Sequence, residues 1–157
     1  MKYTRLTQEQ FEELHPEFIN FLASQTIDKI EWDELKKNKP EVAEQELDVF
    51  SDLIWEGVLS RTRYLEHFSA THVFLFECFE SHIESIIIKS LRSDIDLLAQ
   101  DGLRWLNQEM FGPEVEIRLG KKEYAEERNA AIFSLIQQGA YLSGGEMYQQ
   151  LMSVIRS

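Results

Sequence analysis

The sequence predicts an α+β fold: one globular domain whose helices pack on a small, mostly antiparallel sheet. Residues 1–60 carry helical apolar spacing, residues 61–120 are rich in strand-forming side chains with one helix among them, and residues 121–157 return to helical patterns. Helices and strands that occupy separate stretches are typical of α+β domains rather than of alternating α/β folds. A chain of 157 residues is long enough to bury one core without disulfides, so a single domain over 1–157 is expected.

The first stretch contains two helix signals and one interruption. Thr7 and Gln10 have the Thr-x-x-Gln spacing of a capping box, which predicts a helix beginning at about residue 8. Proline is tolerated in the first turn of a helix but not in its interior, so Pro16 predicts a kink or a new start near His15. A short helix is expected over residues 28–37. Its inward side chains are expected to be Ile27, Ile30 and Leu35, with Trp32 near its edge.

The clearest helix begins at Pro40, because proline suits the first helical position. Apolar residues follow at steps of four, three, four and four, which keeps them on one face of a helix with 3.6 residues per turn. They are Ala43, Leu47, Phe50, Ile54 and Val58.

Residues 67–88, HFSATHVFLFECFESHIESIII, combine three histidines, the only cysteine and four phenylalanines. The residue types of 73–79 and 86–88 favour two strands joined by a turn at 80–82. One long helix through the same residues is the alternative, because short apolar runs do not separate the two by periodicity. Three consecutive isoleucines favour the hairpin.

The remaining elements follow from shorter patterns. A helix is expected within 98–110, although Gly102 weakens it. Alternating apolar and charged residues over 115–119 predict a strand that Gly120 ends. A helix is expected over 121–138 with Gly139 as its stop. Ser143 and Glu146 then have capping-box spacing, which predicts a last helix. Its inward side chains are expected to be Met147, Leu151 and Val154.

Composition narrows the classes of function. The net charge is −12, and residues 1–60 alone carry 6 basic and 14 acidic side chains. Nucleic-acid binding needs clustered lysine and arginine, so a nucleic-acid partner is not expected. One cysteine cannot form an internal disulfide. The N-terminus has no apolar stretch of signal-peptide length, and no apolar run in the sequence approaches the length of a membrane span. A cytoplasmic location without membrane contact is therefore expected.

The central block offers one candidate metal site. Imidazole and carboxylate groups bind divalent transition metals, and His72, Glu80, His82 and Glu84 could supply them. Their spacing matches no specific metal motif, and polar residues around a turn between core strands explain them more simply. No cofactor is therefore expected, with a divalent transition metal as the alternative. Cys78 lies within an apolar run and is expected to be a buried structural residue.

A second candidate is a surface for a protein partner. Five large aromatic side chains lie at or near the edges of the expected helices: Trp32, Trp55, Trp105, Tyr141 and Tyr148. Tryptophan and tyrosine anchor many interfaces, but they are also ordinary core residues. Binding of another protein or self-association would fit such a surface.

The opening MKYTRLTQEQFEELH, with DLIWEGV at 52–58 and RNAAIF at 128–133, resembles a small family of uncharacterised Bacteroidetes proteins. The resemblance spans nearly the whole chain. It implies a bacterial source and a cytoplasmic setting, and it transfers no functional residue. The sequence thus favours a non-catalytic interaction or structural protein. A small metal-dependent enzyme, of hydrolase type, using the central histidines and glutamates is the alternative.

Overall fold

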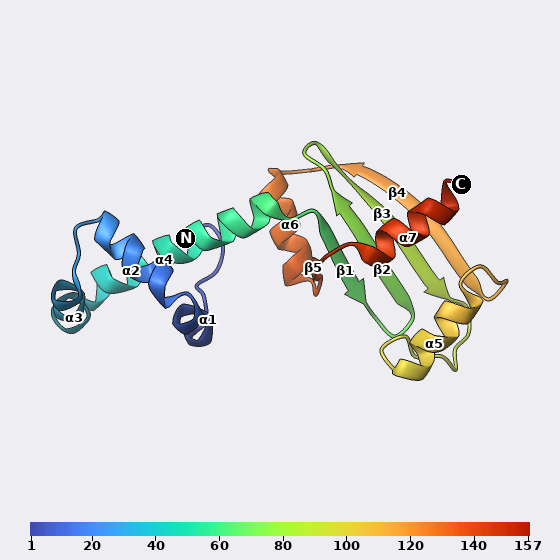
Figure 1. Cartoon of the computed structure of the whole chain (residues 1–157), viewed down its shortest axis with the longest axis horizontal. Coiled ribbons are helices and arrows are strands. Elements are labelled where there is room, and N and C mark those ends of the chain that lie inside the picture. Colours follow the sequence, from blue (N-terminus) through green and yellow to red (C-terminus); the bar gives the residue numbers. More distant parts are fainter. The chain divides into compact units, whose positions relative to one another are not determined.

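The computed structural model describes residues 1–157 and divides them into two compact units, Met1–Ser60 and Arg61–Ser157 (Figure 1). Seven helices and one five-stranded antiparallel sheet make up the chain, which confirms the α+β class. None of the helices combines the length and apolar character needed to cross a membrane. The elements of the first unit are α1 (Gln8–Glu13), α2 (His15–Ser24), α3 (Lys29–Asn38) and α4 (Pro40–Arg61).

The helix starts of the first unit agree with the predicted signals. Thr7 Oγ1 accepts a hydrogen bond from the backbone N–H of Gln10 at 3.2 Å, and the Gln10 side chain accepts one from the backbone N–H of Thr7 at 2.9 Å. Pro16 stands in the first turn of α2, where it removes no helical hydrogen bond. The predicted break near His15 is confirmed.

Aromatic side chains form the core of the first unit. The ring of Phe18 meets those of Trp32 and Phe50 edge to face, with centroids 5.3 and 5.0 Å apart. Ala43 and Phe50 are buried on the predicted stripe of α4. The inward assignment of Ile30 is wrong, since its side chain is 71% exposed. Trp32 faces the core instead, and a residue two positions earlier in a helix points the opposite way.

The second unit is built on a sheet with the strand order β4-β3-β2-β1-β5. The predicted hairpin is confirmed and the long helix is excluded, because Val73 pairs with Ile88 and Leu75 with Ile86. The strands β1 and β5 were not predicted, since the first mixes polar and apolar residues and the second has only three residues. The strands are β1 (Tyr64–Phe68), β2 (His72–Cys78), β3 (His82–Ser90), β4 (Val115–Glu123) and β5 (Tyr141–Ser143).

The helices of the second unit are α5 (Gln100–Glu109), α6 (Arg128–Gln137) and α7 (Glu146–Ile155). Gly102 has a packing role in α5. A Cβ atom at this position would lie 1.8 Å from the backbone oxygen of Asp96, so only glycine lets the helix approach that backbone.

Two boundaries differ from the prediction. Gly120 does not end β4, which continues to Glu123, and α6 begins only at Arg128. The strand continues because its pairing with β3 extends from Val115 to Glu123, with Gly120 opposite Ser85. Backbone pairing therefore outweighs the weak strand preference of glycine.

The start of α7 also differs. Ser143 does not cap the helix: its hydroxyl donates to Glu66 Oε2 at 2.7 Å and accepts from the backbone N–H of Gly145 at 3.0 Å. The helix instead begins after Gly145, whose φ of +83° favours glycine. Val154 is 53% exposed, and Tyr148 is one of the residues that α7 buries in its place.

One face of the sheet, the covered face, packs against α5 and α7. Four strand residues on it are entirely buried: Val73, Leu75, Ile86 and Ile88. They share a hydrophobic cluster with Leu106 of α5 and with side chains of α7. Side chains alternate between the two faces of a strand, so the register also defines which residues point to the opposite side.

Candidate functional site

The face of the sheet opposite α5 and α7 is the candidate site, and we call it the open sheet face. Cross-strand pairs on it include Phe74 with Ile87 and Phe76 with Ser85, and these side chains are all only partly buried. Burying apolar strand residues stabilises a folded domain, so apolar side chains that remain partly exposed on one face indicate a binding surface. The open sheet face comprises His72, Phe74, Phe76, Ile83, Ser85, Ile87, Lys89, Glu116, Arg118 and Lys122.

One end of this side of the sheet is closed near α6. Tyr124 Oη and Arg128 Nε both donate to the backbone oxygen of Phe79, at 2.8 and 3.0 Å, which anchors the segment leading into α6 at the end of β2. Cys78 is 1% exposed there, and burial raises the pKa of its thiol to about 11. The thiol is therefore neutral at physiological pH and unsuited to nucleophilic catalysis.

A row of aromatic rings runs along β2 on the open sheet face. The rings of His72 and Phe74 are stacked with centroids 5.5 Å apart, and those of Phe74 and Phe76 are stacked at 6.5 Å. The imidazole of His67 on β1 adds a tilted contact to Phe74 at 5.6 Å. Rings held in one row by their neighbours lose little conformational freedom when a ligand covers them.

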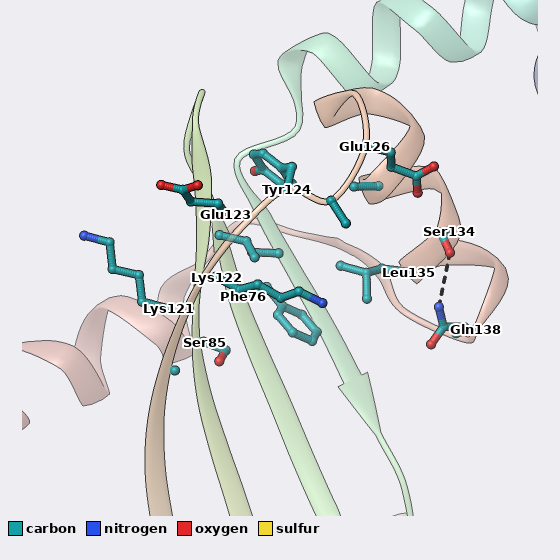
Figure 2. Close-up of a pocket in the computed structure, with 14 residues that line it drawn as sticks. Phe76, Ser85, Lys121, Lys122, Glu123, Tyr124, Glu126, Ser134, Leu135 and Gln138 are labelled. Carbon is teal, nitrogen blue, oxygen red and sulfur yellow. Dashed lines mark hydrogen bonds between the residues drawn. The ribbon is translucent and has the colours of Figure 1, made fainter.

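The row leads into a groove of about 410 Å³ between the sheet and α6 (Figure 2). Phe76, Ile83 and Leu135 supply its apolar lining. Figure 2 shows the Lys122 side chain reaching from β4 toward α6, whereas the neighbouring Lys121 points away from the groove. The groove has the size of a site for a small ligand or a few side chains.

The charges of the open sheet face are mostly positive. Arg118 pairs with Glu116, whose Oε1 lies 2.7 Å from Nη2. Lys89 and Lys122 form no ion pair. A smaller hollow of about 170 Å³ lies beside His72 and Lys89 at the other end of the face. The face thus combines apolar rings with two free ammonium groups, on a chain whose net charge is −12.

The four candidate metal ligands, His72, Glu80, His82 and Glu84, do not gather at one point of the structure. His82 Nε2 lies 3.1 Å from Glu84 Oε2, and this hydrogen bond is the largest cause that lowers the pKa of Glu84. The second carboxylate oxygen of Glu84 binds Arg156 at 3.1 Å. His72 is the first residue of β2, at the opposite end of the hairpin, and Glu80 is exposed in the turn. No three His, Cys, Asp or Glu side chains gather where they could hold one ion.

The five aromatic candidates for a partner surface are distributed over both units and differ in burial. Trp32 and Trp55 belong to the first unit, where Trp32 is 8% exposed and Trp55 packs against the core. Tyr148 is 3% exposed, and Trp105 is half-buried against the same cluster. Tyr141, on the edge strand β5, is 50% exposed. Trp32 and Tyr148 are therefore core residues in this structure, whereas the ring of Tyr141 is exposed.

Sequence reasoning placed Phe74 and Phe76 in the core and did not connect them with Lys122. The connection depends on the pairing of β3 with β4, which brings together residues about forty positions apart. One usable signal was present, because charged Glu116 and Arg118 alternate with apolar residues and so mark a face that is not buried.

The first unit contains a second hollow, of about 830 Å³, above the rings of Phe18 and Trp32. Its lining holds three basic and three acidic side chains, and Lys36 lies 3.5 Å from Asp33. The rim therefore presents no excess of one charge that would indicate a particular ligand.

Comparison with known proteins places the chain in a family but assigns no activity to it. No curated protein and no solved structure matches the chain. One family model matches residues 1–156, nearly the full length, as the resemblance in the sequence indicated. The chain belongs to the family of unknown function DUF6495.

Proposed function

We propose that this protein is a non-catalytic interaction protein of the bacterial cytoplasm, and that its open sheet face binds an acidic, apolar segment of a partner protein. The observation that carries the proposal is the row of half-buried rings on β2 that continues into the groove beside α6.

Apolar contact would supply most of the affinity. Phe74 and Ile87 are cross-strand neighbours at the middle of the face, and Phe76 and Ile83 continue the apolar surface into the groove. Aromatic side chains seated in a groove often dominate binding energy, because they remove much apolar area from water at little entropic cost. An extended segment with apolar side chains at alternate positions would fit a surface of this shape.

Charge supports an acidic partner. Lys89 and Lys122 lie near opposite ends of the open sheet face, and neither forms an ion pair, although Glu116 is the cross-strand neighbour of Lys89. Two separated lysines could orient a segment with acidic residues at its ends. They are too few to hold a nucleic-acid backbone, and the net charge of −12 would repel one.

The metal-dependent enzyme alternative has less support. It needs His72, Glu80, His82 and Glu84 in one concave site, whereas only His82 and Glu84 are in contact. A catalytic metal usually takes three protein ligands and leaves one position open.

Site-specific photocrosslinking tests the proposal. A photoreactive amino acid replaces Ile87 on the open sheet face, and in a separate variant it replaces Val154, which is 53% exposed on α7. The crosslinked protein is identified, purified, and titrated against the uncrosslinked wild-type chain. The proposal expects one protein crosslinked from position 87 and not from position 154, with an acidic and apolar contact segment.

Substitutions then locate the surface. Phe74→Ala should weaken binding of the identified protein at least tenfold, whereas Leu98→Ala, at a residue that is 62% exposed in a loop, should leave it unchanged. Equal crosslinking from positions 87 and 154, or unchanged binding by Phe74→Ala, would refute the proposal.

A further inference from the structure

We propose that two copies of this chain associate through their β4 strands, which pair antiparallel and join the two sheets into one of ten strands. This interface uses the edge of the sheet rather than its open face, so it goes beyond the proposed function. The starting observation is that β4 is a nine-residue strand with one unpaired side (Figure 1). The other edge strand, β5, has three residues and offers little backbone to a partner.

The free backbone groups of β4 follow from its pairing with β3. Residues 91 and 114 continue the register of that pair, and the Leu91 N–H donates to the Glu114 oxygen at 2.9 Å. Hydrogen-bonded and non-hydrogen-bonded pairs alternate along an antiparallel ladder, so even-numbered residues of β4 bond to β3. The odd-numbered residues Ile117, Leu119 and Lys121 therefore direct their N–H and C=O groups toward the free edge.

This parity restricts the registers in which two β4 strands can pair. Odd-numbered residues must face odd-numbered residues, because only they have free backbone groups. Centring the pair on Leu119 aligns all nine residues of each strand. Moving the centre to residue 118 places Arg118 of one chain opposite Arg118 of the other. Moving it to residue 120 places Arg118 against Lys122. Like charges directly opposite each other destabilise a sheet.

The full-length register is also complementary in charge. It places Glu116 of each copy opposite Lys122 of the other, so the two-fold symmetry gives two such pairs. Arg118 then faces Gly120, which brings no charge. Lysines on an edge strand commonly prevent pairing. Here Lys122 disfavours the register centred on residue 120, where it would face Arg118, and it fits the full-length register.

The apolar side chain at the centre supports the same register. Leu119 is 53% exposed in the single chain, and it would lie against Leu119 of the second copy on the two-fold axis. Residues that lie directly opposite each other across the two β4 strands point to the same side of the continuous sheet. The open sheet faces of the two copies would consequently lie side by side and present a doubled surface.

A charge-swap experiment tests the interface, with the mass measured by light scattering after gel filtration and the dimer dissociation constant by sedimentation. Wild type should form dimers. Lys122→Glu and Glu116→Lys should each weaken the dimer about tenfold, because each turns two attractive pairs into repulsive ones. The double variant Glu116→Lys with Lys122→Glu should restore it. Lys29→Glu, in the first unit, makes the same charge change as Lys122→Glu outside β4 and should have no effect.

Circular dichroism of each variant verifies that loss of the dimer is not loss of fold. A wild type that stays monomeric, single variants that dimerise normally, or a folded double variant that stays monomeric would each overturn the proposal.

Crosslinking through an introduced cysteine tests the register directly. Opposed residues of a hydrogen-bonded antiparallel pair have Cα atoms about 5.5 Å apart, which a disulfide can span. Leu119→Cys should therefore form a disulfide-linked dimer under mild oxidation, while Leu98→Cys, at 62% exposure, should not. Cys78 is buried and should not interfere. Equal linkage by both variants, or none by Leu119→Cys, contradicts a β4 interface centred on Leu119.

Discussion

Phe74 and Leu75 are neighbours on β2, yet the structure treats them differently. Leu75 is entirely buried on the covered face against the cluster formed with α5 and α7, whereas Phe74 is only partly buried on the open sheet face. Both are large and apolar, so hydrophobicity alone does not determine which face a domain covers. The difference arises because two helices dock on one side and α6 reaches only one end of the other.

The largest effect is expected from the covered face. Leu75→Ala should lower the free energy of unfolding by about 2–5 kcal/mol, because it removes buried methyl groups and leaves a cavity. Chemical denaturation followed by circular dichroism measures this change. A loss below about 1 kcal/mol would mean that the covered face is not the core of the second unit.

The docking of α5 on the covered face gives the next prediction. Gly102→Ala should destabilise the second unit by about 1–3 kcal/mol although alanine favours helices, because its Cβ would lie 1.8 Å from the Asp96 oxygen. Gly112→Ala serves as a comparison, since the nearest atom to its added Cβ is a flexible Glu109 side-chain oxygen at 3.0 Å. Thermal melting should separate the two variants, and a stabilised Gly102→Ala would contradict the close approach.

On the open sheet face, Phe74→Ala should cost only about 1 kcal/mol, although it removes more atoms than Leu75→Ala does. The reason is that water already reaches the ring in the single chain. Denaturation under the same conditions gives the direct comparison. A cost equal to that of Leu75→Ala would abolish the distinction between the faces.

The smallest effect concerns the pair of His82 and Glu84. The hydrogen bond from His82 lowers the pKa of Glu84, so the ionised carboxylate is favoured in the folded state. Its contribution is present above the ordinary pKa of glutamate, about 4.3, and is lost as the pH falls below that value. Glu84→Gln should thus reduce stability by at most about 1 kcal/mol at neutral pH and by less in acid. A larger loss in acid than at pH 7 would contradict this sign.

Local signals in the sequence predicted much of the fold. The capping box at Thr7, Pro16 and Pro40 each act through backbone geometry within a few residues, so they predicted their helix starts without knowledge of the rest of the chain. The hairpin followed from the residue types around Ile86–Ile88.

The candidate site could not be predicted in the same way. The run Val73–Phe76 is apolar on both sides of the strand, so its pattern does not reveal which side remains open. That choice depends on where α5, α6 and α7 dock, and on the long-range pairing that brings Lys122 beside Ile83. The Ser143 capping-box prediction was wrong for a similar reason, because Glu66 on β1 binds the serine hydroxyl.

The most direct test uses the partner protein that crosslinking identifies, purified without crosslinking. Its affinity is measured for wild type and for Phe74→Ala, and denaturation verifies that each is folded. The account predicts at least a tenfold loss of affinity together with a loss of stability near 1 kcal/mol. Unchanged affinity in a folded Phe74→Ala variant would contradict the claim that the open sheet face is the binding surface.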